Sequence, residues 1–206
     1  MKVAIIGAGN VGKALGGSLA RAGHEVTLAA NHAEHAVDAA REIGATPAES
    51  TAAAAGDADV VILAVPYQAA EAVAADLAPV VGSRTVVDVS NPLKPDLSDL
   101  AVDGTSAAEE IQRRLPGARV VKAFNTLLAS IQANPATQDE PAQALIAGDD
   151  ARAKGDVAQL ASSIGLEPVD VGPLPFARHM ERLAFFNIGL NATQGWGWTS
   201  TWRVVR

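Results

Sequence analysis

The first twelve residues, MKVAIIGAGNVG (residues 1–12), contain the stretch that decides the fold. The uncharged run Val3–Ile6 predicts a buried strand, and the composition of Val11–Ala22 predicts a helix directly after it. A Gly-x-Gly-x-x-Gly pattern joins the two. Strand, glycine turn and helix in this order are typical of a dinucleotide-binding unit.

Each glycine of this loop has its own use. Gly7 permits the tight turn, Gly9 lets the backbone approach a pyrophosphate, and Gly12 lets the helix pack against the strand. The helix N-terminus offers free N–H groups and the positive end of its dipole to an anion. We therefore expect the whole loop to bind the cofactor, that is, Gly7, Ala8, Gly9, Asn10, Val11 and Gly12.

Short apolar runs alternate with alanine-rich helical stretches through most of the chain. The runs expected as strands are Val3–Ile6, Val26–Ala29, Val60–Val65, Thr85–Val89, Val120–Lys122, Ala144–Ala147 and Pro168–Val171. The stretches expected as helices are Val11–Ala22, Ala33–Ile43, Ala69–Ala78, Ala151–Ile164 and Phe176–Leu190. Continuous apolar strands fit a parallel sheet that helices cover on both faces. The fold class is therefore α/β, a doubly wound, mostly parallel Rossmann sheet.

We expect one dinucleotide-binding domain over residues 1–206. Its Rossmann core would occupy residues 1–172, and a short C-terminal helix with a tryptophan-rich tail would occupy residues 173–206. The tail is too small to be the separate helical substrate domain that many dehydrogenases carry.

The end of the second strand bears on the choice between NAD and NADP. NAD-binding proteins place an acid about 20 residues after the glycines, where it accepts from the ribose 2′-hydroxyl and would repel a 2′-phosphate. Here the strand ends in Ala30, Asn31 and His32, without an acid and without an arginine. Asn31 and His32 could bind a phosphate or could simply cap the next helix. NADP is favoured, and NAD stays possible.

Composition excludes several classes of function. The formal charge is −7, which offers nucleic acid and anionic lipid no electrostatic attraction. The chain has no cysteine, so disulfides and thiolate ligands are excluded, and no metal motif stands out. Residues 183–201 carry no charge but contain several amides and hydroxyls, a poor fit to a bilayer. We expect a soluble, cytoplasmic protein with no export signal.

An ordered series of motifs resembles the deazaflavin (coenzyme F420)-dependent NADP oxidoreductase family. It is also similar to the oxidoreductase domain of the STEAP metalloreductases. The motifs are Gly9-Asn10-Val11-Gly12-Lys13, Gly23-His24-Glu25-Val26, Val65-Pro66-Tyr67, Asp88-Val89-Ser90-Asn91-Pro92-Leu93, Val121-Lys122-Ala123-Phe124-Asn125-Thr126, Gly148-Asp149-Asp150, and Asp170-Val171-Gly172-Pro173-Leu174 with Ala177-Arg178 and Glu181.

This resemblance implies where a cofactor lies. Val65, Pro66 and Tyr67 match the segment beside the adenosine and pyrophosphate. Two further segments, Ser90-Asn91-Pro92 and Ala123-Phe124-Asn125, match those near the nicotinamide. Two departures from the family stand out, because Ala30-Asn31 replaces the usual Ser-Arg, and the tail Gln194–Trp202 does not match the family pattern.

The resemblance implies an NADP-dependent oxidoreductase that transfers a hydride between nicotinamide and F420 or a flavin. Hydride transfer needs proximity and alignment rather than a strong acid or base, and no acid–base motif stands out. We therefore assign no catalytic residue. Arg178 and Glu181 are either a surface pair at helical spacing or part of the substrate mouth.

Two other functions stay open. One is an NADPH-dependent reductase of a small imine or carbonyl substrate, with Tyr67 or His179 protonating the product. The other is a sensor that binds dinucleotide without turnover. The aromatic tail also predicts a homodimer, because a small domain would gain burial by pairing.

Overall fold

A computed structural model of the chain describes residues 1–135 and 140–205. Its centre is an eight-stranded sheet in the order β3-β2-β1-β4-β5-β6-β7-β8. The strands are β1 (Lys2–Ile6), β2 (Glu25–Ala29), β3 (Thr46–Pro47), β4 (Val60–Leu63), β5 (Thr85–Asp88), β6 (Arg119–Ala123), β7 (Gln143–Gly148) and β8 (Glu167–Gly172). Neighbouring strands are parallel except for β6 and β7. The predicted fold class is therefore confirmed.

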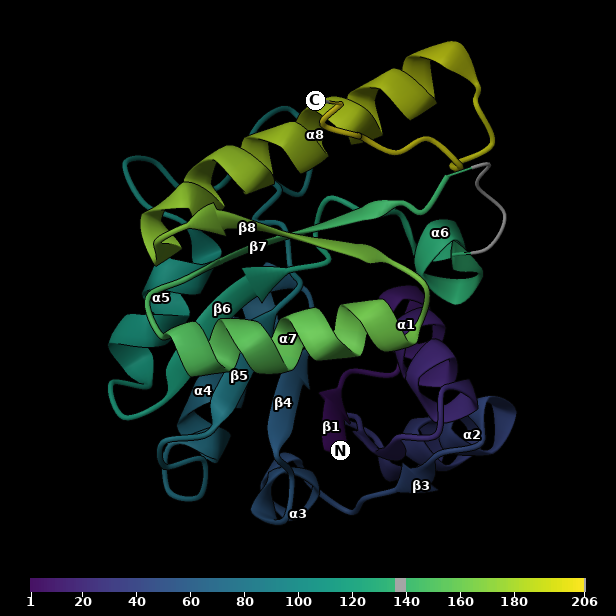
Figure 1. The fold of residues 1–206 in the computed structure, drawn as a ribbon. Coiled ribbons are helices and arrows are strands. Elements are labelled where there is room, and N and C mark those ends of the chain that lie inside the picture. Colours follow the sequence, from purple (N-terminus) through teal and green to yellow (C-terminus); the bar gives the residue numbers. More distant parts are fainter. Residues whose placement is uncertain (136–139, 206) are drawn as a thin grey trace.

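Helices cover both faces of this sheet (Figure 1). They are α1 (Asn10–Arg21), α2 (Ala33–Ile43), α3 (Thr51–Gly56), α4 (Ala70–Leu77), α5 (Ala107–Arg114), α6 (Ala129–Ala133), α7 (Ala151–Ser163) and α8 (Ala177–Gln194), with the 3₁₀ turns η1 (Tyr67–Ala69) and η3 (Leu174–Phe176). Buried side chains of α1, α2, α6 and α7 pack on one face of the sheet. Those of α3, α4, α5, η3 and the start of α8 pack on the other.

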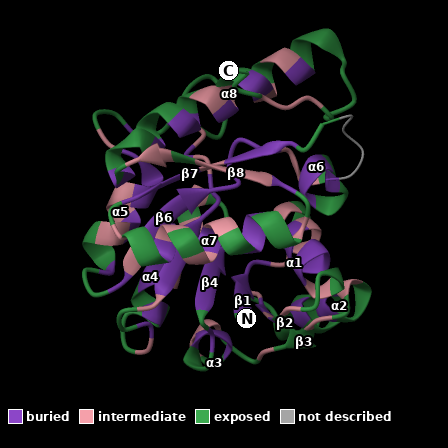
Figure 2. Cartoon of the chain, viewed as in Figure 1, coloured by how far each residue is buried: buried purple, intermediate pink, exposed green. Residues whose placement is uncertain are grey.

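The central strands β1, β4, β5, β6 and β7 are almost wholly buried, which explains their largely apolar sequences, whereas β3 and β8 at the two edges are exposed or only partly buried (Figure 2). All four residues of β4, for example, are buried. Burial of an apolar side chain contributes about 25 cal/mol per Å² removed from water. Because both faces of the central strands carry helices, each residue gains this contribution whichever way it points.

Sequence periodicity missed the short elements. The two-residue β3 and the helices α3, α5 and α6 were not expected, because five to eight residues give too few turns for a 3.6-residue period to stand out. Ser50 and Ser106 cap α3 and α5 with their side chains, a local signal that sequence reading could have used. The C-terminal helix, expected to be short, has 18 residues and continues to Gln194. Of the expected tail, Arg206 lies outside the described residues.

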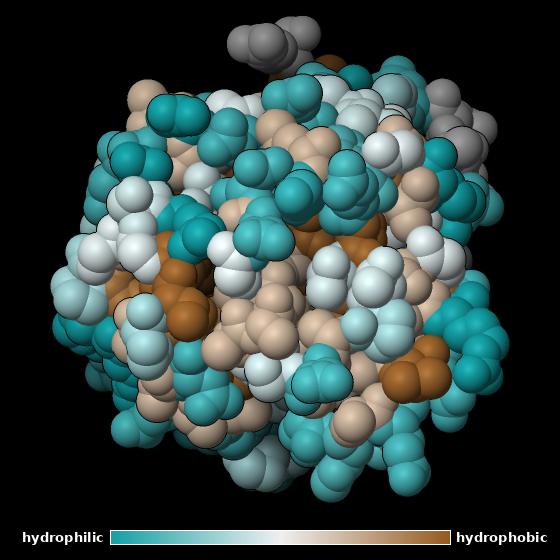
Figure 3. Space-filling model, turned by 90° about the horizontal axis from the view of Figure 1, so that it is seen from below, coloured by the Kyte–Doolittle hydropathy of each residue, from teal (hydrophilic) through white to brown (hydrophobic). Residues whose placement is uncertain are grey.

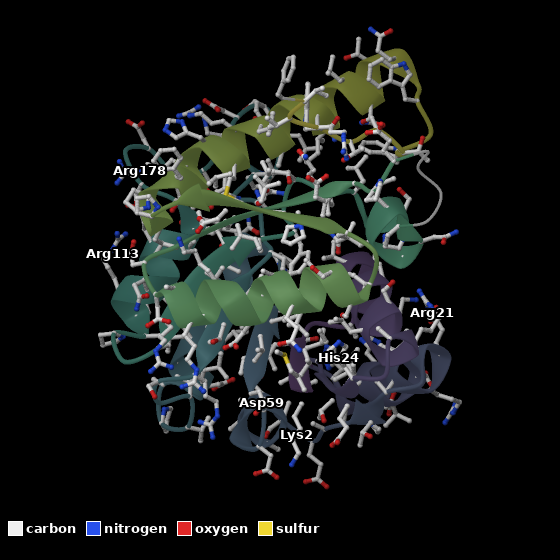
Figure 4. The ribbon with its side chains drawn as sticks, viewed as in Figure 1. Lys2, Arg21, His24, Asp59, Arg113 and Arg178 are labelled. Atoms are coloured by element: carbon white, nitrogen blue, oxygen red, sulfur yellow. The ribbon has the colours of Figure 1, made fainter. Side chains whose placement is uncertain are left out.

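The two ends of the parallel strands differ in character. At the amino ends, the Lys2 amide donates to the Asp59 carboxylate at 2.8 Å, and both residues lie at the lower edge of the molecule (Figure 4). This lower face mixes hydrophilic residues with small, separate hydrophobic patches (Figure 3). At the carboxyl ends lie the glycine loop and the segments that follow β4, β5 and β6. In open α/β sheets ligands bind at the carboxyl ends.

Candidate dinucleotide site and buried charge cluster

The glycine loop is packed so closely that two of its positions accept no side chain. Gly7 has φ +120°, and a Cβ there would lie 2.2 Å from the Ala64 carbonyl oxygen. A Cβ at Gly12 would lie 1.9 Å from the carbonyl oxygen of Gly7. Both distances are far inside van der Waals contact. The first turn of α1 can therefore approach the end of β1 only because both residues are glycine.

Gly9 has a different role from its two neighbours. A Cβ at this position would meet no atom within 4 Å, so the chain itself does not require glycine here. Gly9 is also the N-cap of α1, and no side chain caps this helix end. The first N–H groups of a helix have no partner within the helix. The loop therefore presents open space and backbone donors together, which suits an anion that touches the backbone.

A groove of about 760 Å³ runs from this loop along the carboxyl ends of β1 and β4. This volume is typical of sites that bind small molecules. Its lining comprises Ile6, Gly7, Ala8, Gly9, Lys13, Ala30, Asn31, His35, Asp38, Ala39, Glu42, Thr51, Ala64, Val65, Pro66, Ala69, Ala72, Val73 and Asp76. Of the predicted site residues, the groove thus gathers three of the loop with Asn31, Val65 and Pro66.

The far end of the groove is polar and holds no arginine among the residues lining it. Asn31 lies there with His35, an exposed residue of α2 that is not among the predicted site residues. The ring of His32 meets that of His35 edge to face at a centroid distance of 5.3 Å. Lys13 donates to the Glu42 carboxylate at 2.8 Å, so one of the acidic groups beside the groove is already paired.

A second group of predicted residues follows β5 and β6. Asn91 and Asn125 join these two segments through two hydrogen bonds that their side-chain amides donate. The Asn91 Nδ2 donates to the Asn125 carbonyl at 3.0 Å, and the Asn125 Nδ2 donates to Asn91 Oδ1 at 2.9 Å. The structure therefore brings together the two segments that the resemblance assigned to the nicotinamide side.

Phe124 holds an unusual backbone conformation at this junction. It has φ 61°, which is uncommon for a residue with a side chain, and it is fully buried. The Asn125 N–H donates to the Ala123 carbonyl at 2.8 Å, closing a tight three-residue turn around Phe124. Gln132 Nε2 donates to the Phe124 carbonyl at 3.1 Å and thereby stabilises the turn. Strained turns of this kind gather at functional sites.

Buried polar atoms at this junction that have no partner among the described residues include Ser90 Oγ, Asn125 Oδ1 and Gln132 Oε1. A buried polar group without a partner costs about 1–3 kcal/mol, so such groups call for a ligand or a bound water. Together with the open space at Gly9, these atoms make the arrangement fit an elongated ligand with an anionic middle and a polar end.

A buried lysine behind Ser90 was not singled out from the sequence. The Lys122 side chain is fully buried, and its Nζ donates to Asp88 Oδ2 and Glu181 Oε1, both at 2.7 Å, and to the Ser90 carbonyl at 2.6 Å. Lys122 of β6 is the register partner of Asp88 of β5, which places both side chains on one face of the sheet. The sequence did contain a signal for this site, because a lysine inside an apolar strand is rarely buried without a charged partner.

Burial and charge shift the pKa values of this cluster. Burial alone would lower the pKa of Lys122, but the Asp88 and Glu181 carboxylates outweigh it and raise that pKa above its ordinary value. Burial raises the pKa of Glu181 to about 7, and Asp88 adds to the rise while Lys122 opposes it. The Ala107 amide at the start of α5 also donates to Glu181 Oε1, at 3.0 Å.

The suggested pair of Arg178 with Glu181 is wrong. Arg178 instead donates from Nη2 and Nε to the two oxygens of Glu109, at 2.6 and 2.8 Å. Residues three apart on a helix share a side, but here Glu181 points into the core and Arg178 points to α5. Figure 4 shows Arg178 and Arg113 at the same edge of the molecule, where α8 and α5 meet.

Tyr67 lies in a separate, smaller pocket of about 150 Å³ with Glu71, Glu110 and Arg114. Its hydroxyl donates to Glu110 Oε2 at 2.7 Å. Burial, followed by this bond to Glu110, raises the pKa of Tyr67 to about 12. The hydroxyl is therefore engaged and reluctant to release its proton.

The fold and the site together define a dinucleotide-binding protein of the Rossmann class. No helix in residues 1–135 and 140–205 combines the length and apolar character needed to cross a bilayer. Within the same ranges, no three His, Cys, Asp or Glu side chains gather as a metal site would require.

Comparison with known proteins narrows this class. Residues 2–92 match the family described as NADP oxidoreductase coenzyme F420-dependent. The F420-dependent NADP reductase of Methanothermobacter marburgensis is 35% identical over 213 residues, covering 93% of this chain and 92% of the relative. The rat metalloreductase STEAP3 is 29% identical over 88% of this chain and 36% of its own. The chain belongs to the F420-dependent NADP oxidoreductase family and is an oxidoreductase.

Solved structures agree with this assignment. A putative F420-dependent NADP-reductase from Arthrobacter sp. FB24 superposes with a TM-score of 0.87 and 30% identity over the whole of both chains. A reductive aminase from Aspergillus terreus, solved with NADPH, reaches a TM-score of 0.70 at 22% identity, covering 93% of this chain and 63% of its own. At that identity the likeness concerns the fold.

The raised pKa of Glu181 predicts a pH dependence of stability. The pKa of about 7 in the folded protein lies above the ordinary value of 4.5, so the folded state binds the proton more tightly. The stability this adds is complete below the unfolded pKa and is lost as the pH rises through about 7. In Glu181→Gln the loss should be absent. The free energy of unfolding of the wild type should therefore fall relative to Glu181→Gln by roughly 2–3 kcal/mol from pH 4.5 to 8.

Urea unfolding at a series of pH values measures this difference. The exposed Glu49→Gln is the matched control and should follow the wild type throughout. Parallel curves for wild type and Glu181→Gln would show that Glu181 does not titrate in this range.

Proposed function

We propose that the protein transfers a hydride between NADP and a deazaflavin, F420, with a flavin as the alternative second partner. The observation that carries the proposal is that polar features lie at the carboxyl ends of neighbouring strands, from the glycine loop after β1 to the segments after β5 and β6. Free backbone donors at α1 suit the pyrophosphate, and the unpartnered Ser90 Oγ and Asn125 Oδ1 suit the carboxamide end of a nicotinamide. The names of the relatives support the same pair of substrates.

Each predicted binding residue has a place in this proposal. The amides between Gly7 and Gly12 hold the pyrophosphate. Asn31 and His32 lie at the adenine ribose, where the 2′-phosphate distinguishes NADP from NAD. The segment Val65–Tyr67 lies beside the adenosine and pyrophosphate. The remaining predicted contacts, all on the nicotinamide side, are Ser90, Asn91, Pro92, Ala123, Phe124 and Asn125.

The chemistry asks the protein to align two rings and to exclude water. Reduction of F420 by NADPH moves one hydride to the deazaflavin and consumes one proton. Effective alignment can lower such a barrier by several kcal/mol without a catalytic acid or base. The part-buried Asn91–Asn125 amide pair and the buried Phe124 turn would support that alignment. A cytoplasmic location goes with this proposal and stays a prediction.

The rival function, reduction of an imine or carbonyl, needs a proton donor at the substrate. Tyr67 is poorly suited to that role, because its hydroxyl already donates to Glu110 and its pKa is about 12. His179 is exposed and packs edge to face on Phe176. The proposal therefore favours a reaction between two bound rings over reduction of a small substrate.

Stopped-flow mixing with NADPH and F420 tests the activity. We expect the F420 absorbance to bleach, with FMN as the second acceptor to try. In Gly9→Ala the added methyl group enters the open space beside the glycine loop, where the pyrophosphate would bind. Binding of NADPH should therefore weaken by roughly tenfold or more, while the melting temperature of the protein stays unchanged. Bleaching with neither acceptor by the wild type, or a Gly9→Ala protein that binds NADPH normally, would reject the proposal.

Substitution of Asn31 tests the coenzyme preference. In Asn31→Asp a carboxylate would face the 2′-phosphate and could accept from the 2′-hydroxyl of NAD. We expect the affinity for NADP to fall by about tenfold or more and that for NAD to rise. Asn31→Ala is the control, because it removes the donor without adding charge and should not improve NAD binding. Calorimetry with both coenzymes measures the change, and an unaltered ratio would contradict it.

We also propose a homodimer in which a second copy covers the outer side of α8 and the tail. Phe186, Trp196 and Trp198 are 57%, 48% and 49% exposed, and Phe186 stacks on Trp202 at 5.8 Å. Exposed aromatic side chains of this kind are enriched at interfaces. Sedimentation velocity at micromolar concentration should give twice the monomer mass, and Phe186→Ser should shift the species toward monomer. A wild type that sediments as a monomer would remove this part of the proposal.

A further inference from the structure

The main chain of Ser90 is held from two sides by the buried cluster. Its N–H donates to Asp88 Oδ1 at 2.9 Å, and its carbonyl accepts from Lys122 Nζ at 2.6 Å. Lys122 Nζ in turn donates to the other oxygen of Asp88 at 2.7 Å. Asp88 and Lys122 thus satisfy both backbone hydrogen-bonding groups of Ser90 and hold the main chain from which its side chain projects.

The third acceptor of Lys122 comes from a distant part of the sequence. Glu181 of α8 accepts from Lys122 Nζ at 2.7 Å and from the Ala107 amide at 3.0 Å. One ammonium therefore joins β5, β6 and α8, and its three N–H groups are all used. Because all three side chains are fully buried, the bonds are made without competition from water.

The cluster is a costly way to hold a fold. Moving a charge out of water is unfavourable, and replacing buried charges by apolar side chains of similar size often leaves stability equal or better. The place of this cluster suggests another use. Asp88 and Lys122 contact the main chain of Ser90. The Ser90 hydroxyl is buried and has no partner among residues 1–135 and 140–205.

We propose that Lys122 is a positioning residue that, with Asp88, holds the Ser90 main chain so that the Ser90 hydroxyl meets the nicotinamide end of the coenzyme. The proposal rests on the proposed binding of NADP along the groove. Lys122 itself does not touch the coenzyme. Its effect is confined to the nicotinamide end, since the glycine loop and Asn31 lie on other elements.

The test compares two ligands that differ only at that end. NADP carries the nicotinamide, and 2′-phospho-ADP-ribose lacks its ring. Calorimetry at pH 6 is suitable, because Glu181, with a pKa of about 7, is then mostly protonated and Lys122→Met leaves a single buried carboxylate. Lys122→Met should weaken binding of NADP by about tenfold and leave the fragment within about twofold. The kcat with F420 should fall by roughly ten- to a hundredfold.

Two further variants keep the result interpretable. Lys154→Met removes another lysine–carboxylate pair, with Asp170 at 2.8 Å, away from this segment, and should leave both affinities unchanged. Asp88→Asn preserves the size of the side chain but loses the carboxylate charge and one of two acceptors. It should show the same selective loss in smaller degree, and circular dichroism confirms that each variant is folded.

The outcomes separate the inference from the proposed function. Equal loss for both ligands, or no loss for either, in folded Lys122→Met would overturn the positioning role. Wild-type affinities for both ligands in Asp88→Asn would do the same. A wild type that binds neither ligand would remove the proposed function, and this inference with it.

Discussion

The contact between the first turn of α1 and the end of β1 governs the rest of the candidate site. The carbonyl oxygen of Gly7 lies where a side chain on Gly12 would be, and the Ala64 carbonyl lies where one on Gly7 would be. Such an approach is possible only for backbone without Cβ atoms. Because the helix begins so near the strand, its uncapped N–H groups open directly into the groove between β1 and β4. The groove therefore depends on the close packing of Gly7 and Gly12.

A second constraint operates at the far end of the strands β5 and β6. Asp88, Lys122 and Glu181 are fully buried charges whose geometry satisfies the ammonium completely but leaves Glu181 Oε2 without a partner in the described chain. One ammonium group faces two carboxylates, which leaves one excess negative charge. This charge is neutralised when Glu181 takes up a proton near neutral pH. The helix α8 is thus docked by an interaction whose charge state depends on its surroundings.

At the adenosine end of the groove, the residues that line the site differ from those that the sequence position alone would indicate. The sequence position that usually holds an acid in NAD-binding proteins holds Asn31. Yet Asp38 and Glu42 of α2 line the same groove, where Asp38 pairs with Arg41 at 3.4 Å and Glu42 pairs with Lys13 at 2.8 Å. Surface pairs of this kind contribute at most about 1 kcal/mol each, so their value lies in neutralising carboxylates rather than in stabilising the fold. The preference for NADP therefore depends on more residues than Asn31 alone.

The sequence by itself determined the layered fold and the glycine cradle, because both depend on neighbours in the chain. Apolar strands, helix composition and glycine spacing are local, and they predicted seven of the strands and the loop. The tertiary structure alone decided how Lys122, Asp88 and Glu181 meet, since they lie on three separate elements and the sequence left Glu181 either paired with Arg178 or at the substrate mouth. It alone also placed His35 in the groove and engaged Tyr67 with Glu110. Long-range pairing of buried charges follows from packing, and packing leaves no period in the sequence.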